Sequence, residues 1–264
     1  MPKERAELDV TKLLMQGTVR IEGPDGTGGT GFILHFSESP LQMPVLITAA
    51  HVLEGIGDAA TIVIRTRTQE GKWARMDATL PLRVEGQTRY FRHPDADVAA
   101  LYINIHPTMT PEDYLSTTFL ASDVLLEQHD VRTGDEAFTL SYPHGILANE
   151  EGFATLRGCH IASYPMLPTL YMRSFVLDFE VHEGEAGAPV FVRRDSVKEK
   201  DGTMKPIPGH FGLIIGMLGN PPFSSARFLR LAVAIPASII KETLVLLLEA
   251  DEKKRPERHR VPRS

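Results

Sequence analysis

The stretch GEAGAPVF, residues 184–191, decides the fold and raises the question of function. It contains two glycines with a small residue, Ala186, between them, and a proline and a β-type run follow, which is typical of a tight turn that leads into a β-strand. Such a turn presents one side chain at the mouth of a β-barrel and leaves backbone N–H groups pointing at a single spot. The side chain in the presenting position is the methyl group of Ala186, which cannot act as a nucleophile.

Short β-type runs separated by turn residues extend from this stretch toward both ends of the chain. Runs rich in Val, Ile, Phe, Leu and Thr predict strands. About ten of them are present: GTVRIEG (17–23), GTGFILHF (29–36), MPVLITAA (43–50), ATIVIRTRT (60–68), DVAALYINI (97–105), EAFTLSYP (136–143), MRSFVLDFEV (172–181), APVFVRR (188–194), GLIIGML (212–218) and RLAVAIP (230–236). Only residues 9–16 and 236–254 have helical character. Many short strands with one closing helix indicate an all-β barrel or sandwich.

Two polar stretches interrupt this pattern. Residues 108–135 separate the strands of the first half from those of the second, and we interpret them as the connection between two barrels of comparable size. Residues 192–210 are charged, contain Gly and Pro and lack periodicity, which predicts an exposed loop or a long hairpin. Residues 255–264 are basic and low in apolar side chains, so we expect a frayed tail.

The composition is that of a folded protein and argues against some partners. Hydrophobic residues make up 42% of the 264 residues and charged residues 23%, which are ordinary globular values. The formal net charge of -6 leaves no overall positive field that would attract nucleic acid or an anionic membrane. We therefore expect no nucleic-acid partner and no membrane partner.

Neither targeting signals nor cofactor motifs stand out. Residues 1–16 lack the apolar core of a secretory signal, and no later run reaches the roughly 18 apolar residues of a membrane span. The single cysteine, Cys159, allows no intrachain disulfide, which fits a reducing compartment and predicts a cytoplasmic location. We expect no metal and no cofactor, because Cys159 and His160 lack the spacing of zinc ligands and GTGGTG (26–31) precedes a strand instead of a helix.

Two further motifs place chemically useful side chains at strand ends. LITAAHVLEG (46–55) delivers His51 directly after an apolar strand, where the chain must turn tightly. HPDADVAALYI (93–103) places Asp97 at the head of another apolar strand, where a carboxylate can be partly buried and aimed at a neighbour. Taken singly, each has an ordinary structural explanation, His51 as a structural histidine and Asp97 as a turn or strand-start residue.

Together, His51, Asp97 and residue 186 resemble, in that chain order, the chymotrypsin-like (trypsin-like) serine proteases. TAAH (48–51) matches the family's histidine motif letter for letter, and DVAAL (97–101) closely matches its aspartate motif. GEAGAPV (184–190) matches the nucleophile motif G-x-S-G-x-P-V at every fixed place but one. Without disulfides or a secretory signal, the chain is most similar to the intracellular, bacterial-type branch of that family.

The resemblance implies an all-β fold of two antiparallel, six-stranded-type β-barrels with the active site in the cleft between them, followed by a C-terminal α-helix. The implied divisions are an N-terminal extension (1–13), an N-terminal barrel carrying His51 and Asp97 (14–118), a C-terminal barrel carrying the nucleophile turn (119–235), the helix (236–254) and the basic tail (255–264).

The resemblance also implies a role for each site residue. His51 would be the general base and acid, and Asp97 would hold its tautomer and stabilise its protonated form. The backbone N–H groups of Gly184 and Ala186 would form the oxyanion hole. Ala186 holds the place of the nucleophilic serine, and losing that serine costs on the order of 10⁶ in turnover, so we expect the chain as written to be inactive.

Two hypotheses explain Ala186. In the first, the chain is a trypsin-like serine endopeptidase whose serine has been replaced, either to stop self-cleavage or to trap a substrate. In the second, it is a natural pseudoprotease that binds peptides or proteins without cutting them. We favour the first, because a pseudoprotease has no reason to retain His51, Asp97 and both glycines of the turn. A third hypothesis is a subunit that docks through the apolar helix at 236–254.

The resemblance finally suggests how a protein or peptide substrate would bind. LDFEVHEG (177–184) would line the primary pocket, where Glu180 or Glu183 would favour a basic substrate residue if it pointed inward. Gly216, Met217 and Leu218 would pair through their backbone with an extended peptide. Glu185 stands where many relatives have an Asp that pairs with a newly cut amino terminus. We expect no activation of that kind here, and we expect any control to come from an activating or regulatory protein partner or from loop ordering.

Overall fold

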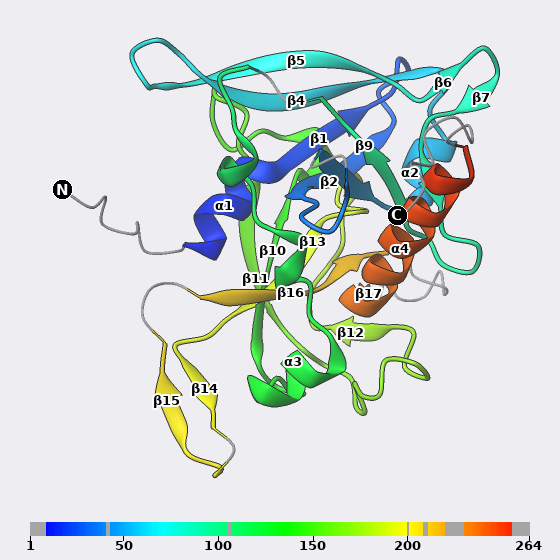
Figure 1. The fold of residues 1–264 in the computed structure, drawn as a ribbon. Coiled ribbons are helices and arrows are strands. Elements are labelled where there is room, and N and C mark those ends of the chain that lie inside the picture. Colours follow the sequence, from blue (N-terminus) through cyan, green and yellow to red (C-terminus); the bar gives the residue numbers. More distant parts are fainter. Residues whose placement is uncertain are drawn as a thin grey trace, which may run out of the picture.

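Figure 1 shows the computed structural model, which describes residues 9–40, 43–104, 107–199, 201–207, 211–219 and 230–254. The strands form two large antiparallel sheets and two small ones, and a long helix follows the last strand. The protein is therefore mostly β with a C-terminal α-helix, as the sequence predicts. Within the described ranges, no helix is long and apolar enough to cross a membrane.

The first sheet comes from the first half of the chain and has seven strands in the order β5-β4-β1-β2-β3-β9-β8. Its strands are β1 (Thr18–Glu22), β2 (Gly28–His35), β3 (Pro44–Thr48), β4 (Ala59–Arg67), β5 (Trp73–Pro81), β8 (Phe91–Arg92) and β9 (Ala99–Tyr102). The sheet curls into part of a barrel (Figure 1). β3 is buried along its whole length, which makes it a rigid base for the residues that follow it.

The second sheet comes from the second half and has six strands in the order β11-β10-β13-β16-β17-β12. Its strands are β10 (Glu136–Ser141), β11 (Thr155–His160), β12 (Phe175–Leu177), β13 (Pro189–Arg193), β16 (Gly212–Leu218) and β17 (Ala232–Pro236). β13 begins inside the stretch 184–191, so the turn at Ala186 leads directly into a central strand of this sheet.

Short elements and helices complete the described part. β6 (Arg83–Val84) pairs with β7 (Gln87–Thr88), and β14 (Ser196–Lys198) pairs with β15 (Met204–Pro206). The helices are α1 (Val10–Gly17), α2 (Ala50–Glu54), α3 (Asp123–Gln128) and α4 (Ala237–Lys254), with 3-10 turns at Pro111–Asp113, Thr117–Phe119 and Pro143–Gly145. α4 contacts β8 and β9 of the first sheet and β16 and β17 of the second, so it lies across both.

The ten predicted runs all contain strands, and both predicted helices form. The β14–β15 pair confirms the long hairpin within 192–210. The sequence did not predict β5, whose alternating pattern includes many exposed positions and which is paired with β4 along its whole length. The large apolar side chains of α4 are buried or partly buried apart from Val245, so packing inside the protein accounts for them. The expected frayed tail, 255–264, lies outside the described residues.

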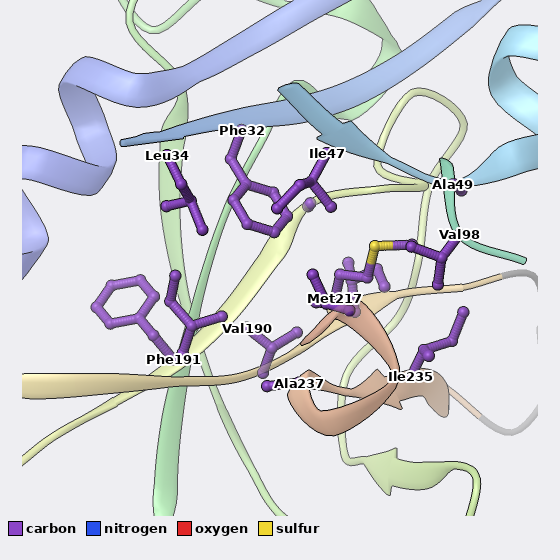
Figure 2. Packing of buried hydrophobic residues seen from close by; sticks show 14 of the residues in the cluster. Phe32, Leu34, Ile47, Ala49, Val98, Val190, Phe191, Met217, Ile235 and Ala237 are labelled. Carbon is purple, nitrogen blue, oxygen red and sulfur yellow. The ribbon is translucent and has the colours of Figure 1, made fainter. Parts of the chain in front are cut away.

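One hydrophobic core joins the two sheets. Figure 2 shows Phe32 and Ile47 of the first sheet on one side of the core and Val190 and Phe191 of the second on the other. All four side chains are completely buried and belong to a single cluster. Because Val190 and Phe191 follow the turn at Ala186 within a few residues, packing in this shared core fixes the turn where the sheets meet.

A buried charged side chain, Arg65 on β4, also links the halves of the chain. It is only 2% exposed. Its Nη2 donates to the backbone oxygens of Gln16, at 2.6 Å, and of Thr18. Its Nη1 donates to the hydroxyl of Tyr142 at 2.9 Å and to the backbone oxygen of Gly152 at 3.1 Å. The guanidinium therefore satisfies backbone groups of the first half and reaches across to the second.

We predict that Arg65→Met lowers the free energy of unfolding by about 2–4 kcal/mol, because buried carbonyl groups lose their donor. Thermal unfolding followed by circular dichroism checks this, with a decrease in Tm of roughly 5–15 °C. Arg132→Met is the control, since the side chain of Arg132 is 70% exposed and pairs with Asp130 at the surface. A decrease in Tm for Arg65→Met no larger than that for Arg132→Met would contradict the prediction.

Candidate functional site

His51 lies in the short helix α2, directly after the buried strand β3. The residue that begins this helix, Ala49, has no side-chain oxygen to accept from the first N–H groups of the helix. The carboxylate of Asp97 does so instead, since its Oδ1 accepts from the backbone N–H of His51 at 2.9 Å. The hydrogen bond to this N–H group therefore helps to hold Asp97 at the start of the helix.

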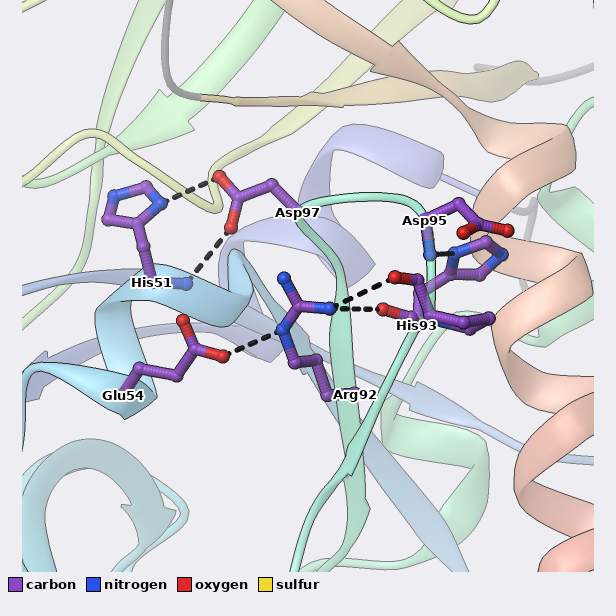
Figure 3. A network of polar contacts seen from close by, with 7 residues as sticks. His51, Glu54, Arg92, His93, Asp95 and Asp97 are labelled. Atoms are coloured by element: carbon purple, nitrogen blue, oxygen red, sulfur yellow. Dashed lines mark hydrogen bonds and ion pairs between the residues drawn. The ribbon is translucent and has the colours of Figure 1, made fainter.

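The same carboxylate holds the imidazole ring of His51. Its Oδ2 lies 2.6 Å from Nδ1 of the ring (Figure 3). When Nδ1–H donates to Asp97, Nε2 carries the free lone pair, and no described residue hydrogen-bonds to Nε2. The His51 side chain is 40% exposed and that of Asp97 is 27% exposed. The pair can therefore act as a general base whose ring is oriented by a carboxylate.

Polar contacts also fix the loop that carries Asp97, which joins β8 to β9. Figure 3 shows Arg92 of β8 reaching Glu54 at the end of α2, with 2.7 Å between Nε and Oε1. Nη1 of Arg92 also donates to the backbone oxygen of His93 at 2.7 Å. Because Glu54 and His51 share one helix, these contacts place the loop and the helix relative to each other.

The turn around Ala186 has the backbone that its glycines predict. Gly184 and Gly187 have φ of +87° and +86°, which residues with a Cβ rarely adopt. The carbonyl groups of the turn are bound to Thr30 of β2. Thr30 Oγ1 donates to the oxygen of Gly184 at 2.7 Å, and the Thr30 N–H donates to the oxygen of Ala186 at 2.9 Å.

The amide groups of the turn are used differently from its carbonyl groups. The N–H groups of Gly184 and Ala186 donate to no described residue. Unpaired N–H groups two positions apart in a glycine turn are the feature that an oxyanion hole requires. The oxyanion-hole role expected of Gly184 and Ala186 stays a prediction, and these two N–H groups are the donors that it would use.

The turn packs directly against the segment that carries His51. A Cβ on Gly187 would lie 2.2 Å from the oxygen of Thr30 and 2.8 Å from the nitrogen of Ala49, so only glycine fits. Thr48, three residues before His51, donates through Oγ1 to the oxygen of Thr30 at 2.7 Å. The structure thus brings the His51 segment and the Ala186 turn together on one strand, β2.

The acidic residues predicted to bind substrate lie on the approach to this turn. The Glu180 side chain is 43% exposed, and its Oε2 lies 3.6 Å from Nε of Arg230. Glu183 is exposed, and its backbone oxygen accepts from the N–H of His144 at 2.7 Å. Both carboxylates are therefore accessible from solvent, in the segment that precedes the turn.

The structure gives Gly216, Met217 and Leu218 a different place from the one expected. All three are buried in β16, which is hydrogen-bonded to β13 on one side and β17 on the other. The N–H of Leu218 donates to Ala188, and its oxygen accepts from Gly187. We correct the expectation for these three residues, because their backbone groups are used inside the sheet and cannot pair with a peptide.

Three residues that support the turn had no signal in the sequence: Thr30, Ser141 and Arg157. Besides Thr30, Ser141 Oγ and Arg157 Nη1 donate to the buried carboxylate of Glu185 at 2.6 and 2.7 Å. Thr30 and Ser141 lie in predicted strand runs, whereas Arg157 lies on β11, which the sequence did not predict. Each of the three contacts a residue far away in the chain. Only the three-dimensional structure reveals these supports.

Other chemistry near the site is limited. Burial raises the pKa of the Cys159 thiol to about 12, so this side chain stays protonated at neutral pH and is not a nucleophile. Among the residues that the structure describes, no group of three or more His, Cys, Asp and Glu side chains is placed to hold a metal ion.

No protein-family model matches the chain, and no curated protein is similar to it in sequence.

We predict that Thr30→Val lowers the free energy of unfolding by about 1–3 kcal/mol, because the buried oxygen of Gly184 loses its donor. Chemical denaturation followed by tryptophan fluorescence measures the change. The matched control is Thr139→Val: Thr139 is equally buried, but its hydroxyl has no hydrogen-bond partner among the described residues. Equal effects of the two substitutions would contradict the role given to Thr30.

Proposed function

We propose that this chain is a serine endopeptidase of the chymotrypsin-like type in which Ala186 occupies the place of the nucleophilic serine. The observation that carries the proposal is the oriented pair of His51 and Asp97, with Nδ1 and Oδ2 2.6 Å apart. The segment that carries His51 packs against a glycine turn in which two N–H groups donate to no described residue. A general base, its orienting carboxylate and an oxyanion hole are the parts that acyl transfer needs.

With serine at position 186, the reaction follows from these parts. Nε2 of His51 takes the hydroxyl proton as the serine oxygen bonds to the carbonyl carbon of the substrate, and the oxyanion is held by the N–H groups of Gly184 and residue 186. The imidazolium, stabilised by Asp97, gives its proton to the leaving nitrogen, and the C–N bond breaks. Water then attacks the acyl-enzyme in the same way and releases the acid.

The methyl group of Ala186 has no proton to give and no lone pair to attack with. The chain as written is therefore inactive in this proposal, while its base and its oxyanion donors remain in place. A natural pseudoprotease that binds peptides or proteins is the second candidate, and the alanine itself is the observation in its favour. Retention of every other part of the site favours the replaced serine.

The proposal includes a fold of two β-barrels, one built on each large sheet, with the cleft between them. The curl of the first sheet and the position of the turn at the junction of the two sheets support it. It also includes a cytoplasmic location, which the single, buried Cys159 supports. The substrate is a protein or peptide, and the accessible carboxylates of Glu180 and Glu183 favour a basic residue near the cut.

We predict that Ala186→Ser restores peptide-bond cleavage. The variant is incubated with a library of peptides of diverse sequence, and the new ends are identified by mass spectrometry, which also reports the residues preferred on each side of the cut. The rate should exceed that of the unsubstituted chain by several orders of magnitude, because a triad serine contributes on the order of 10⁶ to turnover.

The control is Ala186→Ser combined with His51→Ala, which keeps the new hydroxyl and removes its base. Loss of cleavage in this double variant supports the proposal. Equal cleavage in both variants would point to a contaminating protease and contradict it. No cleavage by folded Ala186→Ser would also contradict it, and specific retention of library peptides by the unsubstituted chain would then favour the pseudoprotease.

A further inference from the structure

A carboxylate lies buried between the two N–H donors of the turn. Glu185 separates Gly184 from Ala186 in the chain, and its side chain is 0% exposed. A carboxylate without water around it is stable only when its oxygens are well supplied with donors and a positive charge is near. The backbone of Glu185 runs through the oxyanion turn, so whatever holds this carboxylate also holds the turn.

The carboxylate of Glu185 accepts four hydrogen bonds from described residues, two on each oxygen. Oε1 accepts from Ser141 Oγ at 2.6 Å and from Arg157 Nη1 at 2.7 Å. Oε2 accepts from the backbone N–H of His182 at 2.6 Å and from the same Nη1 at 2.8 Å. Arg157 is the positively charged partner in this set, and it comes from β11, outside the turn.

The same guanidinium holds the approach to the turn as well. Nη2 of Arg157 donates to the backbone oxygen of Glu180 at 3.0 Å. Its carbon Cζ lies 4.7 Å from the centre of the Phe179 ring, which is within cation–π range. One side chain thus contacts residues before the turn and the carboxylate inside it, while 25% of its own surface stays exposed.

We propose that Arg157 is a positioning residue for the oxyanion hole. It supplies from within the chain the charge that keeps Glu185 buried, and it thereby holds the N–H groups of Gly184 and Ala186 in their receptive arrangement. The charge that holds the turn then comes from a side chain within the fold instead of a newly cut amino terminus. This inference rests on the proposed function, and it adds a residue that the catalytic trio does not include.

The test compares Arg157→Gln and Arg157→Lys, both in the Ala186→Ser background, with a fluorogenic peptide that carries the cleavage sequence found in the library. Arg157→Gln should lower kcat about 100-fold, the effect of losing an oxyanion donor, with KM changed by less than about threefold. Arg157→Lys should recover part of the loss, because lysine restores the charge but not the planar contacts to Glu180 and Glu185.

Arg75→Gln is the matched control. Arg75 also contacts both oxygens of a carboxylate, that of Asp77, at 2.7 Å each, but on the exposed strand β5. This variant should keep the kcat of the Ala186→Ser reference. A similar loss of kcat at Arg75 and Arg157 would overturn the proposal, because the effect would then not depend on the turn.

Amide hydrogen exchange gives a readout that needs no activity. In the unsubstituted chain, Arg157→Gln should speed exchange at least about tenfold in peptides covering residues 180–187 and leave β2 unchanged. Unchanged exchange in 180–187 would overturn the proposal. If Ala186→Ser proves inactive, the proposed function fails, and this measurement alone still decides whether Arg157 holds the turn.

A second variant covers the case in which Arg157→Gln does not fold, since it leaves the Glu185 charge buried and unpaired. Arg157→Gln combined with Glu185→Gln removes both charges and should fold. A kcat that recovers toward that of the Ala186→Ser reference in this folded double variant supports the proposal, because a neutral side chain at position 185 no longer needs the charge of Arg157. A kcat that stays about 100-fold lower would overturn it, because the pairing of Arg157 with Glu185 would then not be what holds the turn.

Discussion

Thr30 joins two distant parts of the chain, and the candidate site depends on that junction. Its oxygen accepts from Thr48, shortly before His51, while its N–H and hydroxyl hold the carbonyl groups of Ala186 and Gly184. The carbonyl groups of Gly184 and Ala186 are thus bound to β2, while the N–H groups of the same two residues donate to no described residue. A single buried residue of one strand thus contacts both segments and occupies the carbonyl groups of the turn.

Two arginines, the buried Arg65 and the partly buried Arg157, stabilise the surroundings of this junction in two different ways. Arg65 donates to backbone oxygens and to the hydroxyl of Tyr142, so it links elements through uncharged oxygen atoms. Arg157 instead pairs with the buried carboxylate of Glu185. The first contact holds the halves of the chain together, and the second holds the local shape of the turn. Stability and site geometry are therefore supported by separate side chains.

The sequence predicted the mostly β fold because apolar β-type runs and turn residues are local signals. It also singled out His51 and Asp97, and the structure places Nδ1 of His51 2.6 Å from Oδ2 of Asp97. It did not reveal Arg157 or Thr30, since their roles depend on contacts with residues far away in the chain. The expected peptide-pairing role of Gly216 was wrong because a sequence does not show whether a strand is central or at an edge.

The measurement that tests the central claim most directly is covalent labelling of Ala186→Ser by a fluorophosphonate, read as intact mass and then mapped by peptide. The reagent needs no knowledge of the substrate: the serine oxygen bonds to phosphorus, fluoride leaves, and the base takes the proton. The account predicts a single adduct at residue 186 that is absent when His51 is also replaced by alanine. A folded variant that gains no adduct, or that gains it equally without His51, would contradict the account.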